Sequence, residues 1–157
     1  MVKVMDIMNR EVRSIAPTSS IFEAAKKLKA ENIGSLPVAL DSRLIGTITD
    51  RDITIRVTAE GRDPHETLVR DAMSSDMVVV RPQQELAEAE RLMHDYQLRR
   101  LPVVELDGRL VGYLTMATIA KRDPDEKAVG RVLRGVSQPQ RPAPEKSGSR
   151  SRGKTES

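Results

Sequence analysis

Two copies of one sequence unit fill most of this 157-residue chain, and the duplication restricts its possible folds more than any other feature. Residues 6–40 align with residues 71–105 at a constant offset of 65 residues, and after a one-residue slip residues 41–56 align with residues 107–122. One unit of this length buries too small a core to be stable, so we expect the two units to pack together about a pseudo-twofold axis. Aligned positions that keep the same residue include Pro17/Pro82, Pro37/Pro102, Gly46/Gly112, Thr49/Thr115 and Arg56/Arg122.

Each unit has the pattern of a strand, a helix, a hairpin and a second helix. A proline ends the first strand of each copy, as expected because proline cannot donate to a sheet ladder. A polar turn divides each hairpin, and Asp107-Gly108 is the stronger turn signal. We therefore predict an α/β (α+β) fold in which two pseudo-symmetric β-α-β-β-α repeats pack sheet to sheet. The predicted elements are strands at 11–17 and 76–82, helices at 19–34 and 84–98, hairpins at 35–49 and 100–115, and helices starting at 50 and 116.

The first long helix shows both start and stop signals. Ile21, Ala24 and Leu28 recur at helical spacing, which predicts one apolar face. Ser19 or Ser20 can cap the start of this helix. Gly34 can close its end, because glycine adopts the left-handed conformation at little cost.

The segments divide the chain into two repeats with shorter pieces after each. We assign residues 1–60 to the first repeat, 61–70 to a linker, 71–124 to the second repeat and 125–136 to a C-terminal helix. Residues 137–157 are rich in Pro, Ser, Gly and charge and have almost no apolar residue, so we expect a disordered basic tail.

Several classes of site are excluded or disfavoured by the composition. The chain has no cysteine, which excludes disulfides, thiolate nucleophiles and cysteine-ligated zinc. Its only aromatic residues are Phe22, Tyr96 and Tyr113, too few for a platform that stacks single-stranded nucleic acid. His65 and His94 have no second ligand at metal-binding spacing, so we expect no metal site.

The charge distribution argues against nucleic acid as the main partner. Residues 137–157 hold five basic and two acidic residues, which accounts for the whole formal net charge of +3. The folded body is therefore neutral overall, and only the tail remains as a route to nucleic acid. Apolar runs long enough for a signal peptide or a membrane span are absent from the sequence, so we expect a soluble cytoplasmic protein.

The stretch GTITDRDI, residues 46–53, is unusually polar for the end of a buried strand. Thr49 and Asp50 have a simple explanation as caps of the following helix. Asp52 is replaced by Thr118 in the second copy, so the fold itself does not require a carboxylate there. One carboxylate can accept both hydroxyls of a ribose cis-diol. A helix cap and a ligand contact therefore both remain open for Asp52.

The duplicated unit, with its proline-terminated strand, its LPV strand and its TxxD turn from strand to helix, resembles the cystathionine β-synthase (CBS) domain family. Two tandem copies resemble a Bateman module, and the likeness covers residues 5–122. A chain with little else in it also resembles the small stand-alone CBS-pair proteins of bacteria, such as the hypoxic-response type. The resemblance implies regulatory binding of adenine nucleotides or related adenosyl ligands in clefts between the repeats, usually within dimers, and no catalysis.

Carried over position by position, the resemblance makes the two clefts unequal. The first cleft would use the turn of the first repeat together with the first strand and two arginines of the second. Its residues are Thr49, Arg51, Asp52, Met77, Val78, Val80, Arg99 and Arg100. The second cleft would use Thr115 and Thr118 with the strand at Ser14 and Ile15, and has Gly34 and Ser35 where the first has arginines. We therefore expect one competent site and one that is vestigial or differently used.

The function expected from these observations is that of a sensor and not of an enzyme. It would bind AMP, ADP, ATP or a related adenosyl compound as a regulatory ligand, with no required cofactor, and would act as a homodimer on a target protein that the sequence does not identify. The main alternative is a dimeric scaffold whose clefts stay empty and whose function is protein interaction. Nucleic-acid binding through the tail is a third hypothesis, and it predicts steep salt dependence.

Overall fold

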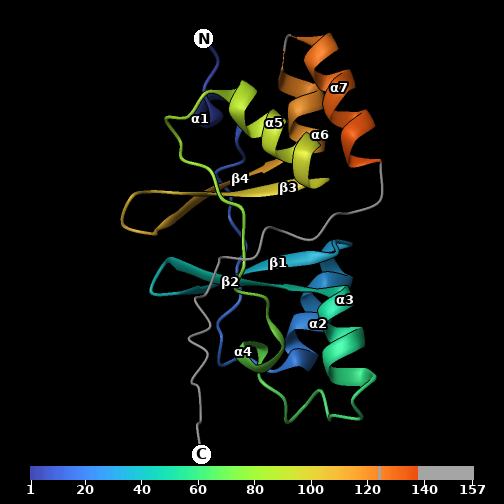
Figure 1. Ribbon diagram of the computed structural model, residues 1–157. Helices are drawn as coiled ribbons and strands as arrows, with labels where there is room; N and C mark the ends of the chain where they lie inside the picture. The colour runs from blue at the N-terminus through green and yellow to red at the C-terminus, as the bar shows by residue number, and fades with distance from the viewer. Residues whose placement is uncertain (124, 138–157) are drawn as a thin grey trace, which may run out of the picture.

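The structure is a computed structural model, and it describes residues 1–123 and 125–137. Apart from Ser137, the segment expected to be a disordered tail lies outside the described residues. Two halves stand one above the other in Figure 1, and their two-stranded antiparallel sheets face each other across the middle of the molecule. This arrangement confirms the predicted fold class. Within the described part, no helix is long and apolar enough to cross a membrane.

The lower half in Figure 1 is built mainly from the first repeat. Its sheet pairs Leu36 with Ile48 and Pro37 with Thr47. The chain turns between the strands at Asp41 and Ser42, which both have positive φ, as in the tight turns that suit hairpins. Its elements are α2 (Ile21–Glu31), β1 (Ser35–Leu40), β2 (Arg43–Thr49), α3 (Asp50–Ile53), the π-helical segment η1 (Thr54–Thr58) and α4 (Val69–Ala72).

The upper half repeats this plan and adds a helix. Leu101 pairs with Leu114 and Pro102 with Tyr113, the counterparts of the pairs named for the first sheet. Arg100 pairs with Thr115 at the end of the same ladder. The additional helix α7 lies along α5 in Figure 1. The elements are α1 (Val4–Ile7), α5 (Leu86–Tyr96), β3 (Arg100–Val104), β4 (Leu110–Thr115), α6 (Met116–Arg122) and α7 (Glu126–Val136).

The strands predicted at 11–17 and 76–82 are reduced to single bridges, which corrects the sequence-based prediction. Ile15 pairs with Val38 and Val80 with Val103, both in parallel. The physical reason is that each segment crosses from one sheet to the other. A segment that crosses in this way can pair with each sheet at only one position.

The predicted helix end at Gly34 is also wrong. Asn32 closes α2 instead, with a left-handed φ of 52°, and Gln97 closes α5 with a φ of 51°. Asparagine is one of the few residues other than glycine that visits this region routinely. At the other end of α2, Ser20 accepts a hydrogen bond from the Glu23 amide at 3.1 Å, so the predicted serine cap is present.

The two halves exchange their leading segments. Asn9 forms two backbone hydrogen bonds with Tyr113 on β4, and Ser74 forms the equivalent two with Thr47 on β2. The apolar residues before these bridges follow them across. Val4, Ile7 and Met8 are buried in the core of the upper half, whereas Val69 and Ala72 are buried in the core of the lower half. Each core is therefore completed by a segment that belongs to the other repeat in the sequence.

Two glycines explain how the crossing segments approach the sheets so closely. A Cβ atom on Gly46 would lie 2.8 Å from the carbonyl oxygen of Ser74, and one on Gly112 would lie 2.6 Å from the Met8 sulfur and 3.1 Å from the Asn9 oxygen. No other residue fits without displacing the crossing segment. The repeated glycine therefore serves the exchange and not the turn that follows it.

Two repeated arginines hold the exchanged segments from the other side. The Arg56 guanidinium donates to the carbonyl oxygens of Ala72 and Met73 at 3.1 and 2.9 Å. Arg122 donates to the carbonyl oxygen of Ile7 at 3.2 Å. Each arginine thus binds carbonyl groups at the end of a short exchanged helix, where no further helical turn can satisfy them.

Candidate ligand clefts between the repeats

The turn after β2 forms a complete capping box. Thr49 is the N-cap of α3, and its hydroxyl accepts a hydrogen bond from the Asp52 amide at 3.0 Å. In return the Asp52 carboxylate accepts from the Thr49 amide, also at 3.0 Å. This reciprocal pair satisfies two donors at the start of the helix. The cap anticipated for Thr49 is therefore present, and Asp52 is part of it.

Asp52 also connects the two repeats. Its second carboxylate oxygen accepts a hydrogen bond from the Ser74 hydroxyl at 3.2 Å, and the side chain is buried, with 9% of the residue exposed. Ser74 belongs to the segment that crosses from the lower to the upper half. The carboxylate absent from the second repeat therefore has a structural role that the sequence did not reveal.

The three arginines predicted for the first cleft lie in different environments. Arg51 on α3 and Arg99 before β3 are exposed. Arg100 is half-buried on β3, beside Thr115, and it lines a cavity at the second cleft. The sequence predicted Arg100 for the first cleft, whereas the structure places it at the second cleft.

The predicted strand residues are corrected in part. Met77 and Val78 are half-buried, so part of each residue remains accessible. Val80 is fully buried in the upper core, and Ile15 is buried in the lower core with 4% exposed. The side chains of Val80 and Ile15 are therefore core groups and do not face a cleft, because each follows its single bridge into a sheet.

A cavity of about 420 Å³ lies at the second cleft, between the two repeats. Thr115 and Thr118 of the upper half and Ser35 of the lower half all line it, as the repeat alignment predicts. Ser14 is half-buried and is not among the lining residues. The remaining lining residues are Asn9, Glu11, Val12, Arg13, Ala30, Glu31, Ile33, Leu36, Pro37, Arg100 and Tyr113.

Hydroxyl groups and a guanidinium face this cavity. The Thr115 hydroxyl accepts from the Thr118 amide at 3.1 Å and lies 2.9 Å from the Thr118 hydroxyl. Burial raises the pKa of Tyr113, against the opposing effects of a hydrogen bond with Ser35 and the positive charge of Arg100. Tyr113 therefore stays a neutral donor and acceptor, close to a fixed cation.

Carboxylates also border the second cleft, although α6, the helix that follows Thr115, has none. Arg13 and Glu31 form an ion pair at 2.7 Å, and Glu31 holds the pKa of Arg13 above its ordinary value. Glu11 lies on the same crossing segment as Arg13. Sequence reasoning missed these residues and Tyr113. For Glu11 and Arg13 the repeat alignment contains the signal, since residues 11–13 align with 76–78, the start of the strand predicted for the first cleft.

The two histidines each have a local partner. The His65 ring packs on Phe22 with 4.2 Å between centroids, and His94 Nδ1 lies 3.1 Å from a carboxylate oxygen of Asp95. In residues 1–123 and 125–137, no group of three or more His, Asp or Glu side chains is arranged to hold a metal ion.

Comparison with known proteins identifies the repeated unit. The CBS domain family model matches residues 4–58 and again residues 69–125. The CBS domain-containing protein YhcV of Bacillus subtilis is 37% identical over 137 residues, which cover 87% of this chain and 96% of YhcV. Hypoxic response protein 1 of Mycobacterium tuberculosis is 33% identical over 140 residues, covering 88% of this chain and 96% of that protein.

Solved structures agree with the sequence matches. A crystal structure of Hypoxic Response Protein I with two coordinated zinc ions superposes with a TM-score of 0.70 at 34% identity and covers 78% of this chain and 100% of that chain. The crystal structure of CBSX2 in complex with AMP gives a TM-score of 0.64 at 26% identity and covers 88% and 100% of the two chains. The duplicated unit, the paired sheets and these matches together show that the chain belongs to the CBS domain family and carries two CBS domains in tandem.

Proposed function

We propose that this CBS pair is a regulatory module that binds an adenine nucleotide or a related adenosyl ligand between its two repeats. The cavity of about 420 Å³ at the second cleft carries the proposal, because it joins both repeats and combines apolar walls with a few polar groups. Its size is within the range of small-molecule sites, roughly 300–1,000 Å³. The AMP complex of CBSX2, a structural relative, supports the same ligand class.

The side chains of the second cleft suit the parts of a nucleotide. Arg100 can bind phosphate oxygens through its guanidinium fork. Glu11 and Glu31 can accept hydrogen bonds from a ribose diol, the role that the sequence suggested for Asp52. Val12 and Pro37 offer apolar surface to a base. We therefore place the ligand in the second cleft first, in contrast to the expectation from the sequence.

The first cleft remains a second candidate site. Each oxygen of Asp52 already accepts one hydrogen bond, from Thr49 or Ser74, and each carboxylate oxygen can accept two. A ribose diol could therefore still bind Asp52 without breaking either bond. Arg51 and Arg99 are exposed and free to move toward phosphate, while Met77 and Val78 offer partly accessible apolar surface.

Regulation follows if the ligand binds two arrangements of the module with unequal affinity. Both clefts lie where a crossing segment passes between the halves, so a bound ligand would touch both repeats. A change in their packing could then be read by a second copy of the chain or by a target protein. We propose a homodimer as the active form and no catalytic step.

The ligand class and the cleft can be tested in one series of measurements. We would record thermal shifts with AMP, ADP, ATP, S-adenosylmethionine, NAD and cyclic di-AMP, followed by calorimetry on any compound that stabilises the protein. Arg100→Ala should weaken binding by about ten-fold or more, since a hydrogen bond to a charged group is lost. Arg62→Ala, at an exposed position of the linker, is the matched control.

Asp52→Asn separates the two clefts. If it leaves the affinity unchanged while Arg100→Ala lowers it, the ligand lies in the second cleft. Loss of binding in Asp52→Asn with an unchanged Arg100→Ala would place the ligand in the first cleft. A panel in which no compound stabilises the protein contradicts nucleotide binding and favours the dimeric scaffold, whose oligomeric state sedimentation would then establish.

A further inference from the structure

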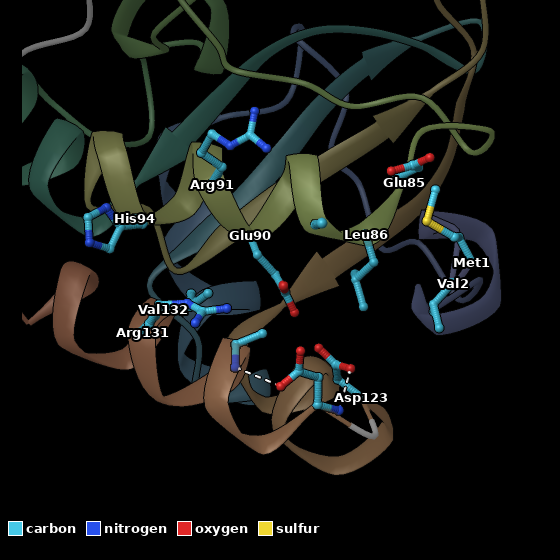
Figure 2. Close-up of a pocket in the computed structure, with 13 residues that line it drawn as sticks. Met1, Val2, Glu85, Leu86, Glu90, Arg91, His94, Asp123, Arg131 and Val132 are labelled. Carbon is cyan, nitrogen blue, oxygen red and sulfur yellow. Dashed lines mark hydrogen bonds between the residues drawn. The ribbon is translucent and has the colours of Figure 1, made fainter.

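A second cavity, outside both clefts, lies between α5, α7 and the N-terminal segment. Its volume is about 490 Å³, and Figure 2 shows the residues that line it. Leu86 on α5 and Ala128 and Val132 on α7 supply apolar walls. The nucleotide proposal does not involve this part of the molecule, because the cavity shares no lining residue with the cavity at the second cleft.

The cavity contains a buried carboxyl group with an unused acceptor. Glu90 is 7% exposed, and its Oε1 atom has no hydrogen-bond partner among the described residues. The pKa of Glu90 is raised to about 8, mainly by burial, with smaller contributions from a hydrogen bond and the charge of Asp123 and from the charge of Asp125, whereas Arg131 opposes the shift. A buried polar atom without a partner is unfavourable by about 1–3 kcal/mol, so its retention at this position needs an explanation.

Acidic groups surround the side of the cavity toward which Glu90 points. In Figure 2 the Glu90 carboxyl is directed toward Asp123, and the Arg91 and His94 side chains lie away from it. Once Glu90 is ionised, a ligand that reaches Oε1 must therefore donate a hydrogen bond, and a positive charge on it would also be attracted by the nearby carboxylates. The residues with titratable or charged groups that line the cavity are the N-terminal Met1, the N-cap Glu85 and the α5 residues Glu90, Arg91 and His94, together with Asp123, Asp125 and Arg131 from α7 and its approach.

We propose that this cavity binds a small organic cation, with a primary ammonium or guanidinium head on Glu90 and an apolar body against Leu86, Ala128 and Val132. Such a ligand supplies the donor that Oε1 lacks and fills the apolar walls. It would bridge α5 and α7, so binding would also fix α7 on the upper half. The inference does not depend on the nucleotide proposal.

The protonation of Glu90 predicts a specific pH dependence for cation binding at this site. Because the pKa of Glu90 is about 8, its carboxyl is mostly neutral at neutral pH, and it must lose a proton to pair with a cation. Binding should therefore release a proton and should tighten about ten- to thirty-fold from about pH 6.5 to about pH 8.5. A ligand that merely fills the apolar walls would show neither effect.

The probe for this test is n-butylammonium chloride, with n-butanol as its neutral isostere. We expect saturable amide shifts on α5 and α7 in nuclear magnetic resonance titrations with the cation and much weaker ones with the alcohol. Glu90→Gln should weaken cation binding about ten-fold or more, because the carboxylate is lost. Glu88→Gln is the matched control, since Glu88 is exposed on the same helix and its side chain accepts a hydrogen bond from Gln84, outside the cavity.

Calorimetry completes the test on the wild-type chain alone. Heats measured at one pH in phosphate and in Tris should differ for the cation, because the released proton is taken up by the buffer. Equal affinity for n-butanol, unchanged affinity in Glu90→Gln, no proton release, or no binding of the cation up to millimolar concentration would each overturn the proposal. The pH comparison needs no variant, so a folding defect in Glu90→Gln could not obscure the result.

Discussion

At the scale of single residues, the pair Asp52 and Thr118 shows how two aligned positions can differ in purpose. Both follow a threonine N-cap by three residues, and both bond that threonine. Asp52 additionally accepts the Ser74 hydroxyl, whereas Asn9, the counterpart of Ser74, bonds the Glu11 amide. The sequence predicted the cap, because capping is local. It could not predict the Ser74 contact, because that bond joins residues 22 positions apart.

Asp52→Ala should lower the free energy of unfolding by about 1–2 kcal/mol, since it removes half of a capping box and a buried hydrogen bond. Asp50→Ala is the control, because Asp50 is exposed and its side chain accepts a hydrogen bond from the amide of the next residue, Arg51. Urea unfolding without nucleotide measures both variants. Equal losses in the two would mean that the capping bond and the Ser74 bond of Asp52 together add no more stability than the single bond of Asp50.

Glu90 should make the stability of the protein depend on pH. Its pKa is about 8 in the folded chain and near 4.5 in the unfolded chain, so the folded state holds the proton more tightly. The contribution of Glu90 to the free energy of unfolding should be greatest below about pH 4.5 and should fall until the pH passes about 8, by at most about 1.4 kcal/mol per unit. Urea unfolding at several pH values checks this, and Glu90→Gln should flatten the curve. An unchanged slope in that variant would assign the pH dependence to another group.

At the scale of elements, helix α7 depends on one close contact. Gly135 packs against His94 of α5, and a Cβ atom added to Gly135 would lie 2.5 Å from the His94 ring and 2.9 Å from its Cα. Gly130 on the same helix has nothing within 4 Å of such an atom. The sequence predicted a helix here from its apolar spacing. It could not distinguish the two glycines, because their difference arises only from the approach of α5.

Gly135→Ala should therefore destabilise the protein by about 1–3 kcal/mol, despite the higher helix propensity of alanine. Gly130→Ala should stabilise it by about 0.5–1 kcal/mol, because it gains that propensity without a clash. Thermal unfolding of the two variants gives the comparison directly. Stabilisation by both would show that α7 does not rest on α5.

Local signals predicted the helices and hairpins well, whereas the first strands were predicted poorly. Ser20 and the apolar spacing of α2 act within a few residues, so the sequence displays them. The single bridges of Ile15 and Val80 depend on a segment that leaves one sheet for the other, which is a property of the assembled pair. The helix end was predicted at Gly34 instead of Asn32 because both asparagine and glycine tolerate the left-handed conformation that closes a helix.

At the scale of the whole molecule, the exchanged segments join the halves into one unit. The hairpin tips also meet, since Leu44 donates to Gly108 and Leu110 donates to Ser42 across the halves. The repeat was visible in the sequence, but its alignment does not say to which core each copy of a segment belongs. Composition could not settle this point, because the exchanged residues are apolar in both copies.

Val4→Ala and Val69→Ala form a matched pair that tests the exchange. Both valines are fully buried and occupy equivalent positions, and each substitution should destabilise the protein by about 1–3 kcal/mol. Hydrogen exchange should show the loss of protection for Val4→Ala in α5 and β4 of the upper half, and for Val69→Ala in α2 and β2 of the lower half. Protection lost in the sequence-adjacent half instead would contradict the exchange.

The exchange of segments also determines the order in which the two cores can form during synthesis. Val4 and Ile7 are synthesised long before Val132 and Val136, with which they share the upper core. The apolar core of the lower half contains no described residue beyond Met73 and can close early. The segment of Val4 and Ile7 instead waits for partners that include Val132 and Val136, more than a hundred residues away. Such distant contacts slow folding. During translation these apolar side chains thus stay without their core until the second repeat and α7 have been made.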